Sequence, residues 1–361
     1  MNPGMGRVPA AIRLRKLTLL IVVSLGVGLT TVQDLPGQEA TRAAKPLTLI
    51  RRYPFPDSIK GHFDHFSVDA EGKRFFGTAV EDRVIVVFDL SKGVMVDAIK
   101  GIDEPRGVLY RPDLKRLYVS DGGGALRIFD STTFRPIKTL KLLVDADPIV
   151  YDAATQRLFV VNGGEKAKHT NSNITVFDTN AGVQVGDIQL DGIEIEGMAV
   201  EKNGPRLFAN NRDKNQIDIF DRQKLTRIAT WPVTMCKGNT VMALDESTHR
   251  MFVACHGGRL VVFDMNSGKA LQALAIGEGS DDIDFDPATK RIYVSGGGGQ
   301  GSVDVYKEND ADHYESLGRF VSAPGAATAR FVPKLGEYIV LAPAHETKPA
   351  EVLVFQVSQN P

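Results

Sequence analysis

The dipeptide Phe-Asp recurs five times at the end of an apolar run, at intervals of roughly 43 residues. The five copies are Phe88-Asp89, Phe129-Asp130, Phe177-Asp178, Phe220-Asp221 and Phe263-Asp264. An Arg that opens a short apolar segment keeps the same phase, at Arg74, Arg116, Arg157, Arg206, Arg250 and Arg291. Two markers with one period indicate repeated supersecondary units, and a period of about 40–45 residues is typical of a four-stranded propeller blade.

The unit at residues 147–190 has the content expected of one blade. Its apolar segments, separated by turn-forming residues, lie at 148–152, 157–161, 173–178 and 183–190. Short runs rich in β-branched and aromatic residues, bounded by Gly, Asn, Asp and Ser, indicate strands joined by hairpins. We therefore predict that each unit forms an antiparallel meander.

Seven units can be counted along the chain. They span residues 62–102, 104–143, 145–191, 195–234, 238–277, 279–322 and 325–361. The last unit is degenerate and lacks a fourth strand, whereas the apolar segment 47–53 is left over before the first unit. A propeller that does not close its ring exposes two sheet edges. We therefore predict an all-β, seven-bladed β-propeller of four-stranded antiparallel blades, forming one domain over 46–361, whose N-terminal strand completes the last blade.

Residues 1–40 differ in character from the rest. A basic flank containing Arg13, Arg15 and Lys16 precedes an apolar run at 17–29. That run is short for a membrane span and typical of a secretory signal. We predict a signal peptide and linker over 1–40, and hence a periplasmic or secreted protein. An uncleaved N-terminal anchor is the alternative, and it would be the only membrane contact that we expect.

The charge balance argues against a nucleic-acid partner. A formal net charge of −1 gives no general attraction for a polyanion. Binding would also need a basic, aromatic-lined surface, and the sequence offers only a small basic rim, at Lys166, Lys168, Arg212 and Lys214.

The chain has two cysteines, Cys236 and Cys255. In an exported protein they could form a disulfide, because both are expected near the same end of neighbouring strands. We favour the alternative, in which they are two independent small core residues.

The repeated charged residues are interpreted as scaffold. The Asp of each Phe-Asp pair begins a turn, where its side chain can accept backbone N–H groups. In five units an acid lies five residues before the strand-opening Arg and should face it across a hairpin, which helps to fix the strand register. The pairs are Asp69 and Arg74, Asp152 and Arg157, Glu201 and Arg206, Asp245 and Arg250, and Asp286 and Arg291.

Several segments carry a family resemblance. They are Arg116-Leu117-Tyr118-Val119-Ser120, Arg157-Leu158-Phe159-Val160-Val161-Asn162, Arg291-Ile292-Tyr293-Val294-Ser295 and the Ile-x-Val-Phe-Asp pattern of 174–178. Over about 300 residues the chain resembles the YVTN-repeat (YncE-like) family of exported bacterial seven-bladed propellers. The resemblance implies an extracytoplasmic binding or scaffold role and identifies no catalytic site.

Function should lie where the repeat is irregular. The residues that lead into each innermost strand surround one mouth of the central channel. Equivalent positions there hold Asp64, Arg106, Asp147, Glu196, Thr240, Asp281 and Ala327, and Asp282 follows one of them. We predict a polar, net-acidic mouth that binds a small polar ligand, a polymer or a protein partner. A merely water-filled mouth is the alternative. The carboxylates there could also bind a divalent cation, although no repeated metal-ligand spacing supports one.

A lactonase-type hydrolase is the alternative function. His65 lies next to Asp64, and Arg106 lies near Glu104. In such an enzyme Arg106 would stabilise an oxyanion, while His65 or Glu104 would activate water.

Further ligand-binding candidates lie in loops. His169 and His345 lie in the enlarged loops 162–173 and 342–351, and His256 lies in the corresponding loop of the fifth unit. We interpret these as surface recognition loops. The sequence has no Gly-x-Ser-x-Gly, P-loop or Cys-x-x-Cys-His motif, so no cofactor is expected.

Overall fold

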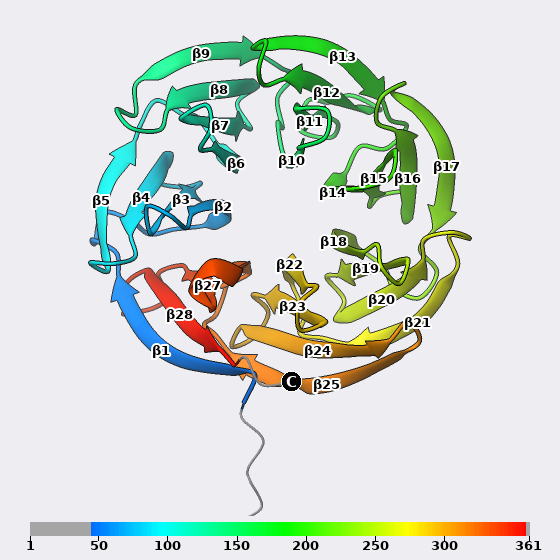
Figure 1. Ribbon diagram of the computed structural model, residues 1–361. Coiled ribbons are helices and arrows are strands. Elements are labelled where there is room, and N and C mark those ends of the chain that lie inside the picture. The colour runs from blue at the N-terminus through cyan, green and yellow to red at the C-terminus, as the bar shows by residue number, and fades with distance from the viewer. Residues whose placement is uncertain (1–44, 359–361) are drawn as a thin grey trace, which may run out of the picture. The chain divides into compact units, whose positions relative to one another are not determined.

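The computed structural model describes residues 45–358. The predicted signal peptide and linker, at 1–40, lie outside the described residues. Within them, the strands form seven sheets of four, arranged around a central opening (Figure 1). Every pairing between neighbouring strands is antiparallel, as in β10 with β11. The predicted seven-bladed propeller is therefore confirmed.

The first four blades follow the sequence order from the centre outward. Blade one comprises β2 (Phe63–Asp69), β3 (Arg74–Ala79), β4 (Val84–Asp89) and β5 (Val94–Ile99). Blade two comprises β6 (Pro105–Arg111), β7 (Arg116–Asp121), β8 (Ala125–Asp130) and β9 (Pro136–Lys141). Blade three comprises β10 (Ile149–Asp152), β11 (Arg157–Gly163), β12 (Ser172–Asp178) and β13 (Val183–Gln189). Blade four comprises β14 (Ile195–Val200), β15 (Arg206–Asn211), β16 (Gln216–Asp221) and β17 (Thr226–Pro232).

Blades five and six continue this order, and blade seven departs from it. Blade five comprises β18 (Asn239–Asp245), β19 (Arg250–Cys255), β20 (Arg259–Asp264) and β21 (Ala270–Ala275). Blade six comprises β22 (Ser280–Asp286), β23 (Arg291–Gly296), β24 (Ser302–Asp310) and β25 (His313–Val321). Blade seven comprises β26 (Thr328–Val332), β27 (Glu337–Ala342), β28 (Glu351–Val357) and β1 (Leu47–Pro54), with a 3₁₀ turn at Pro333–Leu335.

The ring is closed by the N-terminal strand. β1 pairs with β28 from Leu47 opposite Val357 to Pro54 opposite Glu351, with a bulge near Leu49. Blades seven and one are joined at the channel by Thr328, whose hydroxyl lies 2.7 Å from the Phe63 carbonyl oxygen and 2.8 Å from that of Asp64. This arrangement matches the predicted closure.

The core lies between neighbouring sheets, and the Phe-Asp pairs explain how it is built. Each Phe of these pairs is at most 4% exposed, and Phe177, for example, packs against Tyr118 of the preceding blade. Each Asp caps a turn; the carboxylate of Asp89 accepts the N–H groups of Ser91 and Lys92, at 2.9 and 3.0 Å. The other four Asp residues do the same, which confirms their interpretation as scaffold.

The predicted acid–Arg pairs form in only part of the repeat. Asp69 and Arg74 pair at 2.9 Å, and Glu201 pairs with Arg206. Other acids bind a base from the next blade; they are Asp152, which binds Arg222 at 3.1 Å, and Asp245, which binds Lys290 at 2.7 Å. The prediction was wrong at these two positions because a neighbouring blade supplies a competing base.

A disulfide joins Cys236, just after blade four, to Cys255 of β19 in blade five. The favoured alternative of two independent cysteines is therefore corrected. Among the described residues, no helix has the length and apolar character needed to cross a membrane.

Candidate functional site: a polar channel mouth

The mouth residues are positioned by β-bulges. Five innermost strands (β2, β6, β14, β18 and β22) shift register just after their first paired residue. A bulge re-aims the side chains around it and is often found beside binding sites. The residues that follow the first paired residue are Asp64, Arg106, Glu196, Thr240 and Asp281. Their predicted structural equivalence is thus confirmed.

Polar side chains from the second strand hold some of these bulges in place. In blade one the Asp64 and His65 N–H groups donate to Thr78 Oγ1, at 3.2 and 2.9 Å. In blade two Gly107 N–H donates to Ser120 Oγ at 2.8 Å. Thr78 and Ser120 are fully buried, so in blades one and two these contacts to uncharged side chains help to hold the backbone at the mouth.

Arg106 lies between two carboxylates. One guanidinium nitrogen donates to Asp64 Oδ2 at 3.1 Å, and the other donates to Glu104. Burial opposes the charged form of Arg106, but the charges of Asp64, Asp147 and Glu104 outweigh it and raise the pKa. Glu104 also contacts Lys166, with 3.2 Å between Oε1 and Nζ.

His65 lies between two carboxylates, those of Asp64 and Asp282. Its Nε2 lies 3.6 Å from Asp64 Oδ1, and its Nδ1 lies 3.4 Å from Asp282 Oδ1. Burial alone would lower the pKa of His65, but the negative charges of Asp282, Asp64 and Asp147 raise it to about 10. His65 is therefore an imidazolium at neutral pH.

Arg330 of β26 is a further cation that contacts Asp282. The sequence did not predict it as a site residue. Its two terminal nitrogens lie 3.4 Å from Asp282 Oδ1 and 3.3 Å from Asp284 Oδ1. The same two carboxylates accept backbone N–H groups of Ala329 and Phe331. An Arg in an innermost strand was the available signal, but it lies in the degenerate seventh blade, beyond the aligned mouth positions.

Two mouth acids have no cation within ion-pair distance among the described residues. Among the described residues, no ion pair or side-chain hydrogen bond involves Asp147 or Asp281, and Asp147 Oδ1 is shielded from solvent. Burial, followed by the charge of Asp64, raises the pKa of Asp147 well above its usual range, although the charges of His65 and Arg106 oppose the shift. The same two causes raise the pKa of Asp281 to about 7, with further contributions from Asp282 and Glu196.

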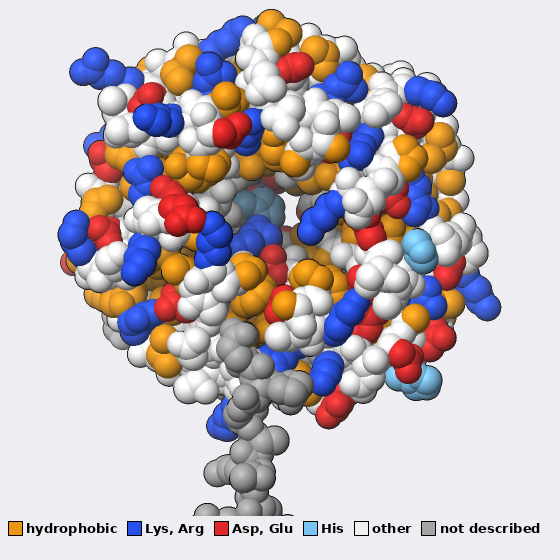
Figure 2. Space-filling view, viewed as in Figure 1, with side chains coloured by type: hydrophobic (Ala, Val, Ile, Leu, Met, Phe, Trp, Pro, Cys, Tyr) orange, Lys and Arg blue, Asp and Glu red, His pale blue; other side chains and the backbone are white. Residues whose placement is uncertain are grey.

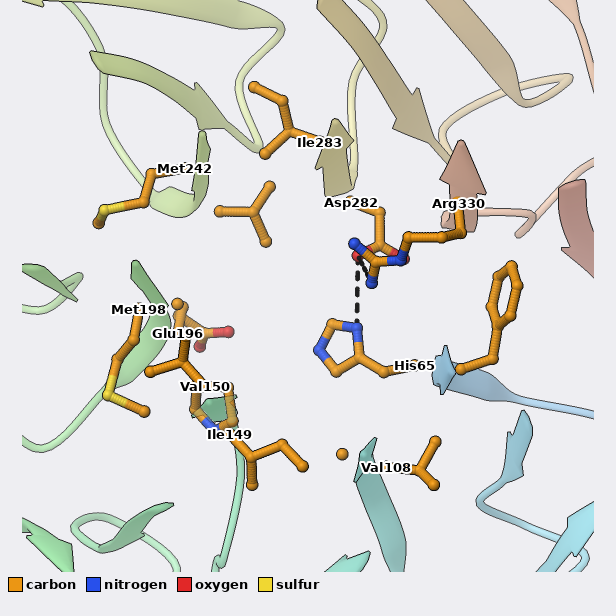
Figure 3. A pocket seen from close by; sticks show the side chains of 15 residues that line it. His65, Val108, Ile149, Val150, Glu196, Met198, Met242, Asp282, Ile283 and Arg330 are labelled. Atoms are coloured by element: carbon orange, nitrogen blue, oxygen red, sulfur yellow. Dashed lines mark hydrogen bonds and ion pairs between the residues drawn. The ribbon is translucent and has the colours of Figure 1, made fainter. Parts of the chain in front are cut away.

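Two cavities occupy this region. The mouth cavity, of about 200 Å³, is lined by a polar set that includes Arg106, Asp145, Asp147, Glu165, Lys166, Glu194 and Glu196. The channel cavity, of about 220 Å³, has His65, Asp282 and Arg330 on one side and Glu196 on another, and apolar side chains from several blades between them (Figure 3). The face shown in Figure 2 is hollowed at its centre, with His and Lys or Arg side chains visible inside. Glu196 lines both cavities.

The enlarged loop of blade three folds over the mouth cavity. Its Lys166 Nζ contacts Asp145 at 3.1 Å as well as Glu104. In blade four, Arg212 binds Glu196 at 3.0 Å and approaches Glu194 at 3.8 Å. Lys166 and Arg212, predicted only as parts of a basic rim, are thus ion-pair partners of the mouth.

Among the described residues, none of the three loop histidines forms a hydrogen bond or ion pair with His65. His256 is half-buried and contacts Arg212, with 3.1 Å between Nδ1 and a guanidinium nitrogen. Burial and the charge of Arg212 lower its pKa. His169 and His345 are exposed, and within residues 45–358 no hydrogen bond or ion pair joins any two of these histidines.

A metal ion fits the cluster poorly. Ligand atoms of Asp64, His65 and Asp147 all lie within 4.8 Å of one another. However, Asp64 is already bound by Arg106, and the guanidinium would repel a bound cation at that distance. Protonated His65 would first have to lose its proton.

The predicted hydrolase residues lie together but are poorly prepared for that chemistry. Asp64 links Arg106 to His65, and Glu104 binds Arg106. A general base must be able to accept a proton at working pH. His65 is already protonated, and Arg106 and Lys166 hold the pKa of Glu104 below its usual value although burial opposes them.

No protein-family model matches the sequence, and no curated protein matches it. Among solved structures, a chain in the crystal structure of a mitotic checkpoint complex is similar in fold, with a TM-score of 0.71 and 14% sequence identity. The match covers 96% of this chain and 100% of that chain. The fold and this likeness define the class of protein: a seven-bladed β-propeller.

Proposed function

We propose that this chain is an exported, YVTN-type propeller that binds a small polar ligand at its channel mouth without transforming it. The observation that carries the proposal is the state of Asp147. Its Oδ1 is buried and has no hydrogen-bond partner among the described residues, although its neighbours Asp64 and Glu196 are bound by Arg106 and Arg212. A buried carboxyl group left without a hydrogen-bond partner costs free energy that a ligand can recover.

Export and family membership are part of this proposal. The repeated Arg-Leu-Tyr-Val-type segments support a YVTN-type propeller, and the basic and apolar N-terminal sequence supports secretion. The Cys236–Cys255 disulfide adds support, because disulfides persist mainly in oxidising compartments.

Ligand-dependent stabilisation of the intact chain tests the binding function. We would measure the melting temperature with a panel of amines, carboxylates, sugars and nucleotides. A ligand at one hundred times its dissociation constant should stabilise the chain by about 2.7 kcal/mol. We expect at least one class to do so, and Asp147→Asn to abolish the effect. Glu315→Gln, an exposed acid on β25 far from the channel, is the matched control.

Two results would oppose the proposal. One is a panel that yields no stabilisation, or stabilisation that Asp147→Asn leaves unchanged. The other is turnover of a lactone that disappears in Arg106→Gln while the fold is retained, which would favour the hydrolase.

A further inference from the structure

The outer hairpin of blade six is longer than its counterparts. β24 and β25 have nine residues each, whereas the third and fourth strands of blades one to five have six or seven. The turn between β24 and β25 contacts blade five (Figure 1). Arg250 of β19 donates to the Ala311 carbonyl at 2.9 Å and binds Asp312 at 3.1 Å, and Gln272 of β21 donates to the Asp312 carbonyl at 2.9 Å. Side chains of a neighbouring blade therefore hold this hairpin.

Two buried acids from different blades share one hydroxyl group beside the hairpin. Glu308 of β24 is 2% exposed, and Asp245 of β18 is 3% exposed. Thr248 Oγ1 lies 2.8 Å from Asp245 Oδ2 and 2.8 Å from Glu308 Oε1. The other oxygen of Glu308, Oε2, is shielded from solvent and has no hydrogen-bond partner among the described residues. Thr248 thus joins the two carboxyl groups across the junction of blades five and six.

These contacts need one more hydrogen than Thr248 supplies. A threonine hydroxyl donates a single hydrogen and accepts through its lone pairs. It can donate to one of the two carboxyl groups, so the second 2.8 Å contact needs a hydrogen from a carboxyl group. Without that hydrogen, two acceptor oxygens would face each other in a buried place, at the cost of an unmade hydrogen bond. One of the two acids is therefore protonated.

The surrounding donors assign this proton to Glu308. Asp245 accepts from Lys290 at 2.7 Å and from the N–H and hydroxyl groups of Ser247 at 3.0 and 2.7 Å. Lys290 Nζ lies 3.9 Å from Glu308 Oε2, which is too far for a hydrogen bond. Asp245 is therefore the carboxylate, and Glu308 is the acid that donates to Thr248. Burial and the nearby Asp245 raise the pKa of Glu308 to about 7. Thr248 and the charge of Lys290 oppose this shift only in part.

We propose that Glu308 is a pH-sensitive latch, which holds the long hairpin of blade six on blade five when protonated and releases it when ionised. Ionisation removes the hydrogen that Glu308 donates to Thr248 and places a second negative charge beside Asp245. The repulsion acts across the junction between the two blades and so favours separation of the hairpin from blade five. This inference goes beyond the binding function at the channel mouth and does not depend on it.

The other charged and titratable groups around Glu308 have partners of their own. Arg250 binds Asp264 at 2.9 Å and Asp312 at 3.1 Å. Tyr314 lies opposite Glu308 in the pairing of β24 with β25, and its hydroxyl donates to a backbone carbonyl of the hairpin at 2.9 Å. Burial, followed by the charge of Glu308, raises the pKa of Tyr314. Tyr314 therefore stays neutral over the pH range in which Glu308 ionises.

Hydrogen exchange of residues 308–315, followed by mass spectrometry of the intact chain, tests the latch. We expect the pKa of Glu308 to be near its usual 4.5 when the hairpin is open and about 7 when it is closed. The closed state then keeps a proton that the open state loses, so closure weakens as pH rises from about 4.5 through 7. The protection of these amides, corrected for intrinsic exchange, should fall about tenfold for each pH unit in that range and level off above it.

A neutral substitute for Glu308 should remove this pH dependence. Glu308→Gln keeps an N–H group that can donate to Thr248 at every pH, so its hairpin should stay protected up to about pH 8. Glu315→Gln, which changes an exposed acid of the same hairpin, is the matched control and should keep the wild-type dependence. Two exposed histidines, His249 and His313, also lie in these turns, and comparison of chains that differ only at position 308 cancels their contribution.

Carboxyl carbon NMR gives the pKa of Glu308 directly, and the loss of one resonance in Glu308→Gln identifies it. A pKa near 4.5, hairpin protection that is constant between pH 5 and 7, or an equal pH dependence in Glu308→Gln would each overturn the proposal. Should Glu308→Gln fail to fold, Thr248→Val decides in its place. Removal of the shared hydroxyl should lower the protection at pH 5 by about tenfold or more and flatten its pH dependence; an unchanged dependence would mean that no such latch exists.

Discussion

His65 Nδ1 lies 3.4 Å from Asp282 Oδ1, although the two residues belong to blades one and six. Asp282 also contacts Arg330 of blade seven. His65, Asp282 and Arg330 therefore link three blades at the channel, and the positive charge of His65 lies beside Asp64 and Asp147.

Removing the acid of this pair should release the proton of His65. The pKa of His65 is raised to about 10 against burial, and Asp282 is the carboxylate that contributes most. We expect Asp282→Asn to lower this pKa and to reduce the free energy of unfolding at pH 7 by about 3–5 kcal/mol. Proton NMR of the imidazole resonances measures the first effect, and urea unfolding the second.

The free energy of unfolding should fall as rising pH removes the proton of His65. The folded-state pKa of His65 lies above its unfolded value near 6.5, so protonated His65 stabilises the fold fully below about pH 6.5. That stability is lost as pH rises toward 10. Asp282→Asn should narrow the pH range over which protonated His65 stabilises the fold. A wild-type His65 resonance that titrates near pH 6.5 would contradict this prediction.

Deleting the closing strand should open the ring. β1 covers β28, and Leu47 is 1% exposed. A chain that lacks residues 47–54 should lose more than about 3 kcal/mol of stability, because burial of one Leu side chain alone contributes about 1.5–3 kcal/mol. The exposed β28 edge should also promote association. Unfolding and size-exclusion measurements would compare it with a chain that begins at Lys45, and equal behaviour of the two would refute closure by β1.

The sequence predicted those features that depend on the repeat. The Phe-Asp turns recur at one spacing, and Asp64 and Arg106 occupy equivalent positions because the blades share one topology. Arg330 escaped prediction because blade seven departs from the pattern. Nor could the sequence show that Asp152 pairs with Arg222 instead of Arg157, or that Asp147 forms no ion pair. Those outcomes depend on which of several bases lies nearest in three dimensions.

The disulfide should stabilise the junction of blades four and five. Cys236 and Cys255 are separated by 19 positions, and closing a loop of that size stabilises a fold by about 2–4 kcal/mol. We expect the double variant Cys236→Ser, Cys255→Ser to unfold at correspondingly lower denaturant. Its unfolding should be indifferent to dithiothreitol, whereas that of the wild type should shift. A wild type insensitive to reductant would show that the bond does not form.

Ionisation of Asp281 should lower the free energy of unfolding of the unliganded protein at neutral and higher pH. Burial and the charges of Asp64, Asp282 and Glu196 raise its pKa to about 7, although protonated His65 partly opposes them. The folded state therefore holds a proton that the unfolded state has lost, and stability falls as pH rises from about 4 through 7.

Neutralising Asp281 should remove that loss. Asp281→Asn is expected to raise the free energy of unfolding at pH 8 by on the order of 1–3 kcal/mol and to leave it unchanged near pH 3. Urea unfolding across this pH range measures the difference. A variant that is less stable than the wild type at pH 8 would show that Asp281 is not under such repulsion.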